Sequence, residues 1–165
     1  AILTDTVVAP IEGLQRTDLY NVDGGWVWLR QYDNDDYEAT TRTVCGPNGT
    51  NKTLDLDAIK ARYGAGFHGY LWPVTAAGGE FYLSVSYQGP GQNWLYDLID
   101  STGNVVLAGL GSCNGYYTNT ANPLPDGVFV ARKGFEYGWM DLHGQWVYCQ
   151  NIFYSSGDDA ENYYF

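Results

Sequence analysis

Basic residues, histidines and long apolar runs are scarce in this 165-residue chain, and each scarcity removes a class of function. Eight Lys and Arg residues stand against nineteen Asp and Glu residues, and the net charge of −11 repels nucleic-acid phosphates and anionic lipid headgroups. A membrane-spanning helix needs about 18 uninterrupted apolar residues, whereas Gly, Asp or Arg breaks every apolar run here within a few positions. We therefore expect neither a nucleic-acid partner nor a membrane span in this chain.

The chain has only three cysteines, Cys45, Cys113 and Cys149, and an odd number excludes a complete disulfide framework. At most one bridge can form within a chain, and we interpret the cysteines as free thiols that pack as small hydrophobic side chains. No two Cys or His residues lie two to five positions apart, which is the usual spacing of a zinc ligand pair. The sequence therefore predicts no cofactor.

Aromatic residues and glycine are abundant instead. The chain contains fifteen Tyr, six Trp and 21 Gly, and 16% of its residues are aromatic. Aromatic rings fit the half-buried surface of a pleated sheet, and glycine supplies the positive φ that tight turns require. This composition predicts an all-β fold, and the length corresponds to a single domain over residues 1–165.

Turn glycines recur at a fixed spacing in three segments. The distance between the two turn glycines of a segment is 24 residues in the first two segments and 17 in the third. The glycine pairs are Gly25 and Gly49, Gly79 and Gly103, and Gly127 and Gly144. One unit copied along a chain is the signature of a repeat architecture. We place the units at approximately 24–54, 78–108 and 126–149, with connectors between them.

Each unit predicts a β-hairpin. When the second glycines are superposed, an apolar pair, a residue that is usually Asp and two turn residues precede the glycine, and an apolar strand usually follows it. Short turns between apolar runs are a strong hairpin signal, and here we expect two-residue turns. We therefore predict antiparallel hairpin repeats, about three units, that form a meandering or solenoid-like assembly of sheets. In one connector, Leu56, Ile59 and Tyr63 share a face at helical spacing, which predicts a short helix near residues 55–63.

The third unit, FEYGWMDLHGQWVY, resembles the WG repeat, a β-hairpin repeat of bacterial proteins. Gly138-Trp139-Met140-Asp141 and Gly144-Gln145-Trp146-Val147 carry the similarity. In the second unit Asp97 stands in place of the glycine and Leu98 in place of the aromatic residue, and the first unit keeps little beyond its apolar pair and turn. The resemblance implies a chain of hairpins from an exported or surface-anchored bacterial protein, with no general catalytic residue set to transfer.

Candidates for catalysis have simpler explanations as turn residues. His143 occupies the turn position of Asn48 and Thr102 in the other units, whereas His68 has no equivalent and leaves a Cys-His pairing open. Asp100 and Asp141 could form the carboxylate pair of a glycosidase, but both occupy one repeat position, where an Asp commonly hydrogen-bonds its own backbone two residues on. We expect no catalytic residues.

An acidic segment, YDNDDYE, is the one candidate metal site. It places Asp33, Asp35, Asp36 and Glu38 within six residues, and clustered carboxylates are the hard ligands that calcium takes. The alternating acids, glycine and distal Glu of an EF-hand loop are missing, so we interpret the segment as a solvated acidic loop with calcium as the weaker alternative.

Exposed aromatic residues are the remaining functional signal. Trp72 and Trp94 lie in segments outside the repeated strand positions, and with Tyr96 they are our candidate ligand-binding residues. The sequence therefore predicts a non-enzymatic extracellular or cell-surface repeat module for protein interaction or adhesion. The alternative is a carbohydrate-binding domain or a glycoside-active enzyme that uses exposed aromatics. The chain starts at Ala1 and has no leader in which a charged segment precedes an apolar one. A mature or trimmed piece of an exported protein would start in this way, so we expect export.

Overall fold

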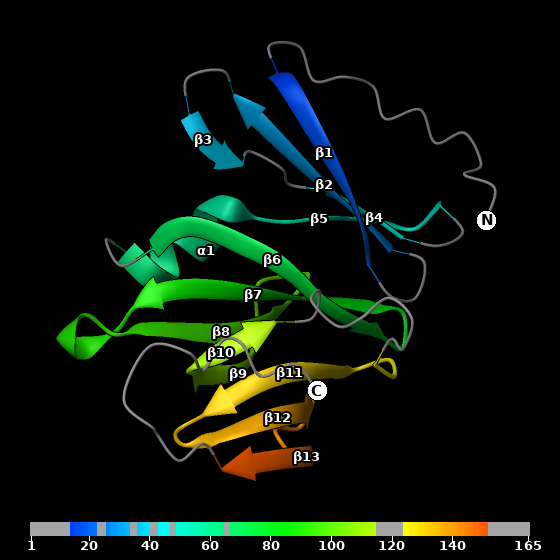
Figure 1. The fold of residues 1–165 in the computed structure, drawn as a ribbon. Coiled ribbons are helices and arrows are strands. Elements are labelled where there is room, and N and C mark those ends of the chain that lie inside the picture. The colour runs from blue at the N-terminus through cyan, green and yellow to red at the C-terminus, as the bar shows by residue number, and fades with distance from the viewer. Residues whose placement is uncertain are drawn as a thin grey trace.

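The computed structural model describes residues 14–22, 26–33, 36–39, 43–46, 49–64, 67–114 and 124–151. These residues form thirteen β-strands, one α-helix and one short 3₁₀ turn, η4 (Pro90–Gln92). All strand pairs are antiparallel, so the predicted all-β class built from antiparallel hairpins is confirmed. Figure 1 shows three sheets, with the first uppermost and the last lowermost in that view.

Each sheet uses one continuous stretch of chain. Sheet A has the order β1-β2-β4-β5, and β3 pairs with β2. Its strands are β1 (Leu14–Val22), β2 (Trp26–Asp33), β3 (Asp36–Ala39), β4 (Thr43–Cys45) and β5 (Asn51–Thr53). Sheet B consists, in order, of β6 (Phe67–Ala77), β7 (Glu80–Gln88), β8 (Trp94–Asp100) and β9 (Val105–Leu110). Sheet C consists, in order, of β10 (Ser112–Asn114), β11 (Val128–Lys133), β12 (Glu136–Asp141) and β13 (Trp146–Asn151).

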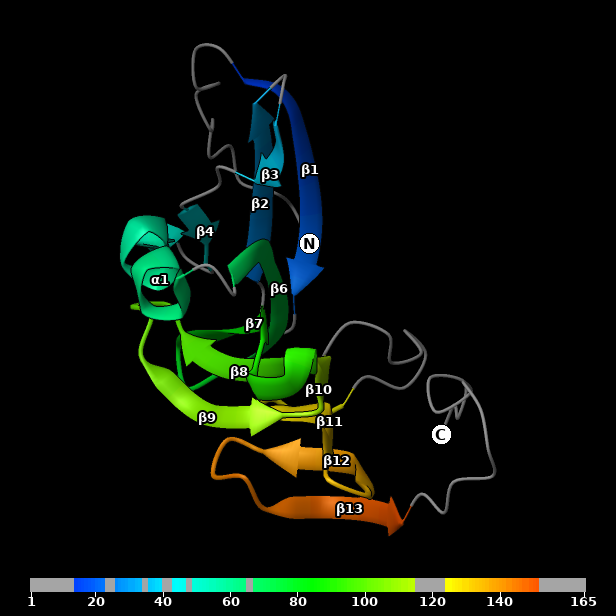
Figure 2. The ribbon, with the colours of Figure 1, turned by 90° about the vertical axis from the view of Figure 1, so that its left-hand side faces the viewer.

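The predicted short helix is confirmed as α1 (Leu56–Tyr63). It begins where the Asp55 carboxylate accepts a hydrogen bond from the Ala58 amide at 2.9 Å, which satisfies one of the free N–H groups of the first turn. Leu56 and Ile59 are the buried residues of the helix. In Figure 2 the helix lies to one side of sheets A and B.

The hairpin turns of sheets B and C share one hydrogen-bond pattern. The Asp100 amide donates to the Asn104 carbonyl at 3.0 Å, and the Asp141 amide donates to the Gln145 carbonyl at 2.9 Å. Each pair encloses three residues, the last of which is a glycine with positive φ, 85° at Gly103 and 77° at Gly144. This is a type I turn followed by a left-handed bulge residue. The expected positive φ is confirmed, but the expected two-residue turn is wrong because the bulge adds a residue.

Gly49, the equivalent glycine of sheet A, also has a positive φ, 73°. Before it, the Gly46 amide donates to the Thr50 carbonyl, the same pairing as in the other two turns. The three hairpins therefore share this backbone hydrogen bond and the positive φ of the glycine, although only the last two have an Asp at the first position.

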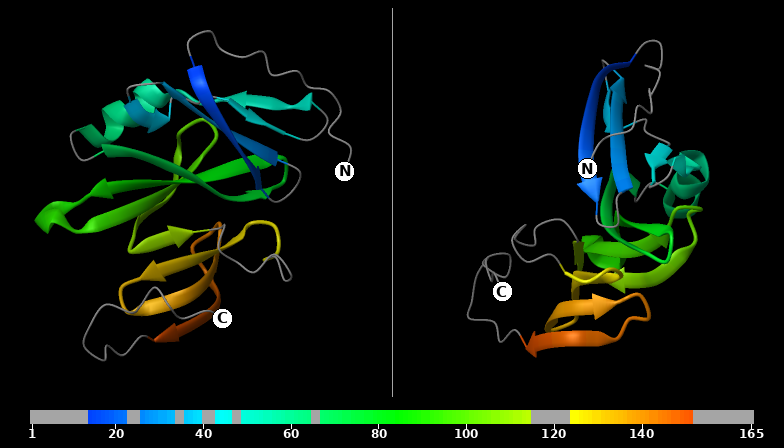
Figure 3. Two further views of the ribbon diagram at one scale, coloured as in Figure 1. Left: turned by 45° about the horizontal axis from the view of Figure 1, so that its top comes forward. Right: turned by 90° about the vertical axis from the view of Figure 1, so that its right-hand side faces the viewer.

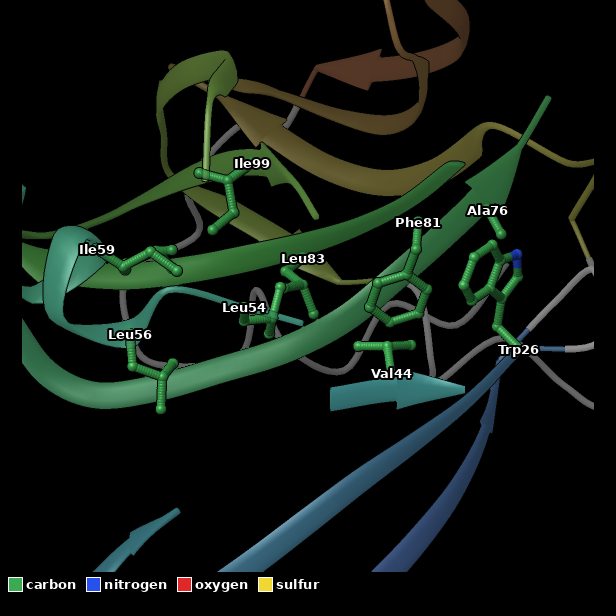
Figure 4. Close-up of a cluster of buried hydrophobic side chains, with 10 residues drawn as sticks. Trp26, Val44, Leu54, Leu56, Ile59, Ala76, Phe81, Leu83 and Ile99 are labelled. Carbon is green, nitrogen blue, oxygen red and sulfur yellow. The ribbon is translucent and has the colours of Figure 1, made fainter. Parts of the chain in front are cut away.

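Sheet B is the centre of the molecule because both of its faces are buried. One hydrophobic cluster joins sheet B to sheet A and α1, and a second joins it to sheet C. The first cluster contains Trp26, Val44, Leu54, Leu56, Ile59, Ala76, Phe81, Leu83, Val85 and Ile99 (Figure 4). The second contains Val74, Leu98, Leu110, Cys113, Phe129, Ala131 and Met140. The views of Figure 3 show the same order of sheets.

Polar contacts also tie the sheets together. Between sheets A and B, the Lys52 ammonium lies 2.7 Å from the Glu80 carboxylate. Within sheet A, the same ammonium lies 5.6 Å from the centre of the Trp26 ring. Burial acts to raise the pKa of Glu80, but its hydrogen bonds, with Lys52 foremost, outweigh this and lower that pKa. Between sheets B and C, the buried Thr75 hydroxyl accepts a hydrogen bond from the Gly127 amide at 3.0 Å. An ion pair and a hydrogen bond therefore add to the apolar contacts that hold neighbouring sheets together.

Candidate functional site

The three predicted ligand-binding residues lie on one face of sheet B. Trp72 on β6 is opposite Ser84 on β7, and Ser84 is opposite Leu98 on β8. Tyr96 and Trp94 lie two and four residues before Leu98 on the same strand, and alternate residues of a strand point to the same side. The structure therefore places Trp72, Trp94 and Tyr96 on the same face of sheet B, the one that packs against sheet C, with Trp72 in the row of Leu98 and Trp94 four residues before it.

Two of these aromatic residues reach solvent. Trp72 is 36% exposed and Trp94 is 44% exposed, whereas Tyr96 packs against the cluster between sheets B and C. Short polar side chains share their face, because Tyr96 is opposite the buried Ser86 and Trp94 is opposite Gln88. We call Trp72, Ser86, Gln88, Trp94 and Tyr96 the aromatic face. It offers flat apolar rings next to a hydroxyl and an amide, a combination suited to amphipathic ligands.

The turn before Trp94 sets where this residue enters the sheet. The Gly89 amide donates to the Asn93 carbonyl at 2.9 Å, and Gly91 inside the turn has a φ of 79°. A Cβ on Gly89 would lie 2.5 Å from Leu95 Cδ1, so a larger residue would displace Leu95. Gln92 also has a positive φ, 62°, which is uncommon for a non-glycine residue. This turn therefore holds the start of β8 in one defined conformation.

On the opposite face of sheet B lies a buried carboxylate that the sequence analysis did not single out as functional. Asp97 on β8 is 6% exposed. Its two oxygens accept hydrogen bonds from the Tyr63 hydroxyl at 2.8 Å, the Tyr87 hydroxyl at 2.9 Å and the Gly109 amide at 2.8 Å. The two phenol rings also pack together, with centroids 4.9 Å apart. Asp97 thus joins α1, β7, β8 and β9 at one point.

Both phenols of this cluster stay protonated at neutral pH. Burial, followed by the hydrogen bond and charge of Asp97, raises the pKa of Tyr87 to about 12. The same two causes raise the pKa of Tyr63 well above its ordinary value. The hydroxyls therefore act as hydrogen-bond donors to the carboxylate, which is a positioning role.

Asp97 departs from the predicted repeat pattern, and this departure is the sequence signal that could have singled it out. The equivalent residue of sheet C is Gly138, where a Cβ would collide with the backbone of Tyr148 and Cys149 on the next strand. In sheet B the pairing of β8 with β9 shifts register between Tyr96 and Leu98, and this irregularity makes room for a side chain. A charged residue at a position that elsewhere demands glycine indicates a local change of structure.

The turn carboxylates are where the repeat predicts them. Asp100 Oδ1 accepts hydrogen bonds from the amides of Thr102 and Asn104, each at 2.9 Å. Asp141 Oδ1 accepts from the amides of His143 and Gln145, also at 2.9 Å. The expectation that both carboxylates bind their own turn backbone is confirmed. His143 is an exposed residue of that turn, and the side chain of His68 lies outside the described residues.

The calcium candidate is only partly within the described chain. Asp33 and Asp36 are opposite each other where β2 and β3 pair. Asp35 lies outside the described residues, as do the side chains of Asp33, Asp36 and Glu38. Calcium binding therefore stays a prediction. Among the described side chains, no group of three or more His, Cys, Asp and Glu residues could hold a metal ion.

The three cysteines are free thiols, and they differ in environment. Cys113 is buried in the cluster between sheets B and C, and burial and the charge of Asp97 raise its pKa. Cys45 is half-buried, and burial raises its pKa as well. Cys149 is exposed on β13, so the expectation that the thiols pack as hydrophobic side chains is wrong for this residue.

The fold and the aromatic face define an all-β chain of antiparallel sheets with a partly exposed aromatic surface. A family model described as "Domain of unknown function (DUF5046)" matches residues 1–159, and the chain belongs to this family. No curated protein and no solved structure matches the chain. Within the described residues, no helix has the length and apolar character needed to cross a membrane.

Proposed function

We propose that this protein is a non-enzymatic binding module that acts outside the cell or at the cell surface, in protein interaction or adhesion. The observation that carries the proposal is the aromatic face, on which Trp72 and Trp94 are exposed to solvent. Large flat rings bury much apolar area at little cost in side-chain entropy, which makes them effective anchors for a partner.

Two features support a binding role over catalysis. The carboxylates at repeated positions, Asp100 and Asp141, are occupied by their own turn amides. The buried carboxylate of Asp97 is held by two phenols that stay protonated at neutral pH. In both arrangements neighbouring groups already hydrogen-bond the carboxylate oxygens.

The net charge of −11 supports a partner other than nucleic acid, because a chain so acidic repels phosphate backbones. The resemblance of the third unit to the WG repeat supports origin in an exported bacterial protein. Both remain parts of the proposal.

Carbohydrate binding is a second candidate, and the composition of the aromatic face favours it. Sugar rings stack their apolar faces on Trp and Tyr, and their hydroxyls bond to short polar side chains. Tyr96 is opposite Ser86, and Trp94 is opposite Gln88, so apolar and polar groups alternate on this face.

Both candidates are tested by the same variant. We expect Trp94→Ala to abolish saturable binding to a glycan array or to a purified protein partner, with the circular dichroism spectrum unchanged. Phe135→Ala is the matched control, because Phe135 is an exposed aromatic residue in the turn between β11 and β12. Turnover of a chromogenic glycoside that is lost on Asp97→Asn would contradict the non-enzymatic proposal. Binding that survives Trp94→Ala and Trp72→Ala would place the ligand elsewhere.

A further inference from the structure

The three hairpins place equivalent residue pairs in the three sheets. When Gly49, Gly103 and Gly144 are superposed, Val44-Cys45 of β4, Leu98-Ile99 of β8 and Trp139-Met140 of β12 coincide. Adjacent residues of a strand point to opposite faces, so each pair has one side chain on each face of its sheet.

The direction in which each member points follows one rule. The first residue faces the following sheet, because Val44 of sheet A belongs to the cluster shared with sheet B, and Leu98 of sheet B belongs to the cluster shared with sheet C. The second residue faces the preceding sheet, because Ile99 packs toward sheet A and Met140 toward sheet B. Along the order of sheets A, B and C, the first residue of the pair therefore faces forward and the second faces back.

Four of the six residues are fully buried, and the two others face no further sheet within the part of the chain that the structure describes. Val44, Leu98, Ile99 and Met140 are at most 1% exposed. Cys45 and Trp139 are only half-buried. Cys45 lies on the face of sheet A that points away from sheet B, and Trp139 lies on the face of sheet C that points away from sheet B.

The outer face of sheet C has the character of a packing surface. Val130, Trp139 and Tyr148 are opposite one another across β11, β12 and β13, so they form one row on this face. The rings of Trp139 and Tyr148 are in contact, with centroids 5.5 Å apart, and Tyr148 is 42% exposed. We call Val130, Trp139 and Tyr148 the outer row.

We propose that the outer row binds sheet A of a second copy of this chain, so that copies stack head to tail. The contact continues the interfaces between sheets A and B and between sheets B and C, with Trp139 in the place of Val44 and Leu98. In the second copy, Cys45 takes the place of Ile99 and Met140. Such a contact is heterologous, so it builds open chains of copies or closed rings. The net charge of −11 opposes the association, and salt therefore favours it.

Sedimentation velocity tests the proposal on the whole chain. In about 0.15 M salt, where the Debye length is about 8 Å, we expect species larger than a monomer that grow with protein concentration. Trp139→Lys and Tyr148→Lys should each reduce the protein to a monomer, because a charge on the outer row cannot be desolvated against sheet A. Phe135→Lys is the matched control and should assemble as the original chain does, since Phe135 lies in a turn outside the outer row. A purely monomeric original chain at millimolar concentration would overturn the proposal.

Mixing variants establishes which faces meet. Trp139→Lys blocks the outer row and leaves sheet A intact, whereas Cys45→Lys blocks sheet A and leaves the outer row intact. Each variant alone should be monomeric, and an equal mixture should form a 1:1 dimer and nothing larger. If Cys45→Lys alone still assembles, the outer rows of two copies pair with each other and the head-to-tail proposal is wrong.

Thiol reactivity gives a second measurement that does not depend on a lysine at Cys45. In a Cys149→Ser background, Cys45 is the accessible thiol of the described chain, because Cys113 is buried. Its rate of reaction with a maleimide should fall at least several-fold as the protein concentration rises, and Trp139→Lys should remove this dependence. A rate that is independent of concentration in an assembled sample would show that sheet A is not at the contact.

Discussion

Leu98 and Ile99 are consecutive residues of β8, both are fully buried, and they belong to different hydrophobic clusters. Leu98 packs toward sheet C and Ile99 packs toward sheet A. A strand of an antiparallel sheet commonly has one wet face, and polar residues then alternate with apolar ones. At Leu98 and Ile99 both faces of β8 are dry, so here apolar residues follow each other directly. Val74 and Ala76 of β6 also belong to different clusters, although they are two residues apart, because the register of β6 with β7 shifts between Pro73 and Thr75.

Replacement of the buried carboxylate should destabilise the protein. Asp97→Asn removes the charge that strengthens three hydrogen bonds, and bonds to charged groups are worth about 1.5 to 3 kcal/mol each. We expect the free energy of unfolding to fall by about that amount, as measured by urea denaturation. Asp126→Asn, at an exposed turn carboxylate, is the control and should change stability by less than about 0.5 kcal/mol. Equal effects of the two changes would show that the phenol cluster contributes nothing.

Alkaline pH should weaken the same cluster. The pKa values of Tyr63 and Tyr87 are raised on folding, so the folded protein holds these protons more tightly than the unfolded chain does. The stability that results is complete below pH 10, the ordinary tyrosine value, and is lost as pH rises through about 12. Tyr87→Phe should lower stability at neutral pH and flatten its dependence on pH in this window. Ultraviolet absorbance of tyrosinate and denaturant titrations at each pH measure the two effects.

The turn glycines should tolerate substitution unequally. At positive φ an L-residue costs about 1 to 2 kcal/mol, and this cost applies to Gly49, Gly103 and Gly144 alike. A new Cβ would lie 3.0 Å from Leu107 at Gly144 and 3.4 Å from Ile59 at Gly103, whereas it meets nothing at Gly49. We therefore expect an Ala substitution to reduce stability most at Gly144 and least at Gly49. Val substitutions should follow the same order with larger losses. Thermal unfolding of the three Ala variants measures this order. An equal loss of stability at all three positions would mean that the side chains of Leu107 and Ile59 move aside at little cost.

The turn aspartates should behave as structural residues of modest value. Asp141→Asn keeps an oxygen for the amides of His143 and Gln145 but loses the charge, so we expect a loss of about 0.5 to 1.5 kcal/mol. Asp100→Asn should cost at least as much, because Asp100 accepts the same two amide bonds and two more from the Thr102 hydroxyl and the Asn104 side chain. Neither change should affect ligand binding. Binding lost on Asp141→Asn, with folding intact, would place a functional site at this turn.

The predictable parts of the fold are those fixed by neighbouring residues. The turn glycines, the turn aspartates and α1 each depend on interactions within a few positions, so spacing and residue type indicated them. The first strands of sheets B and C, β6 and β10, lie outside the predicted units because their sequences carry neither the turn glycine nor the alternation. β6 has a proline, Pro73, and two register shifts in its pairing with β7, so its pattern is irregular.

The parts that escaped prediction depend on distant pairs. Asp97 meets Tyr63 from 34 residues away, and no local signal shows that a helix tyrosine will reach this strand. The aromatic face was expected only as a set of residue types, and the register of three strands was needed to show that Trp72, Trp94 and Tyr96 share a side. The half-buried state of Cys45 likewise follows from its place at the end of the stack, although its repeat position predicts burial.

Each sheet is built from one uninterrupted stretch of chain, so no strand must wait for a partner from a later part of the sequence. Contacts within a sheet are therefore short-range along the chain, which favours rapid formation. During synthesis the segment of sheet B can pair its own strands as soon as residues 67–110 have emerged. Its face toward sheet C, including Leu98, stays wet until residues 112–151 follow. During this interval the apolar face of sheet B is exposed to solvent. We expect the growing chain to be most prone to aggregation at that time.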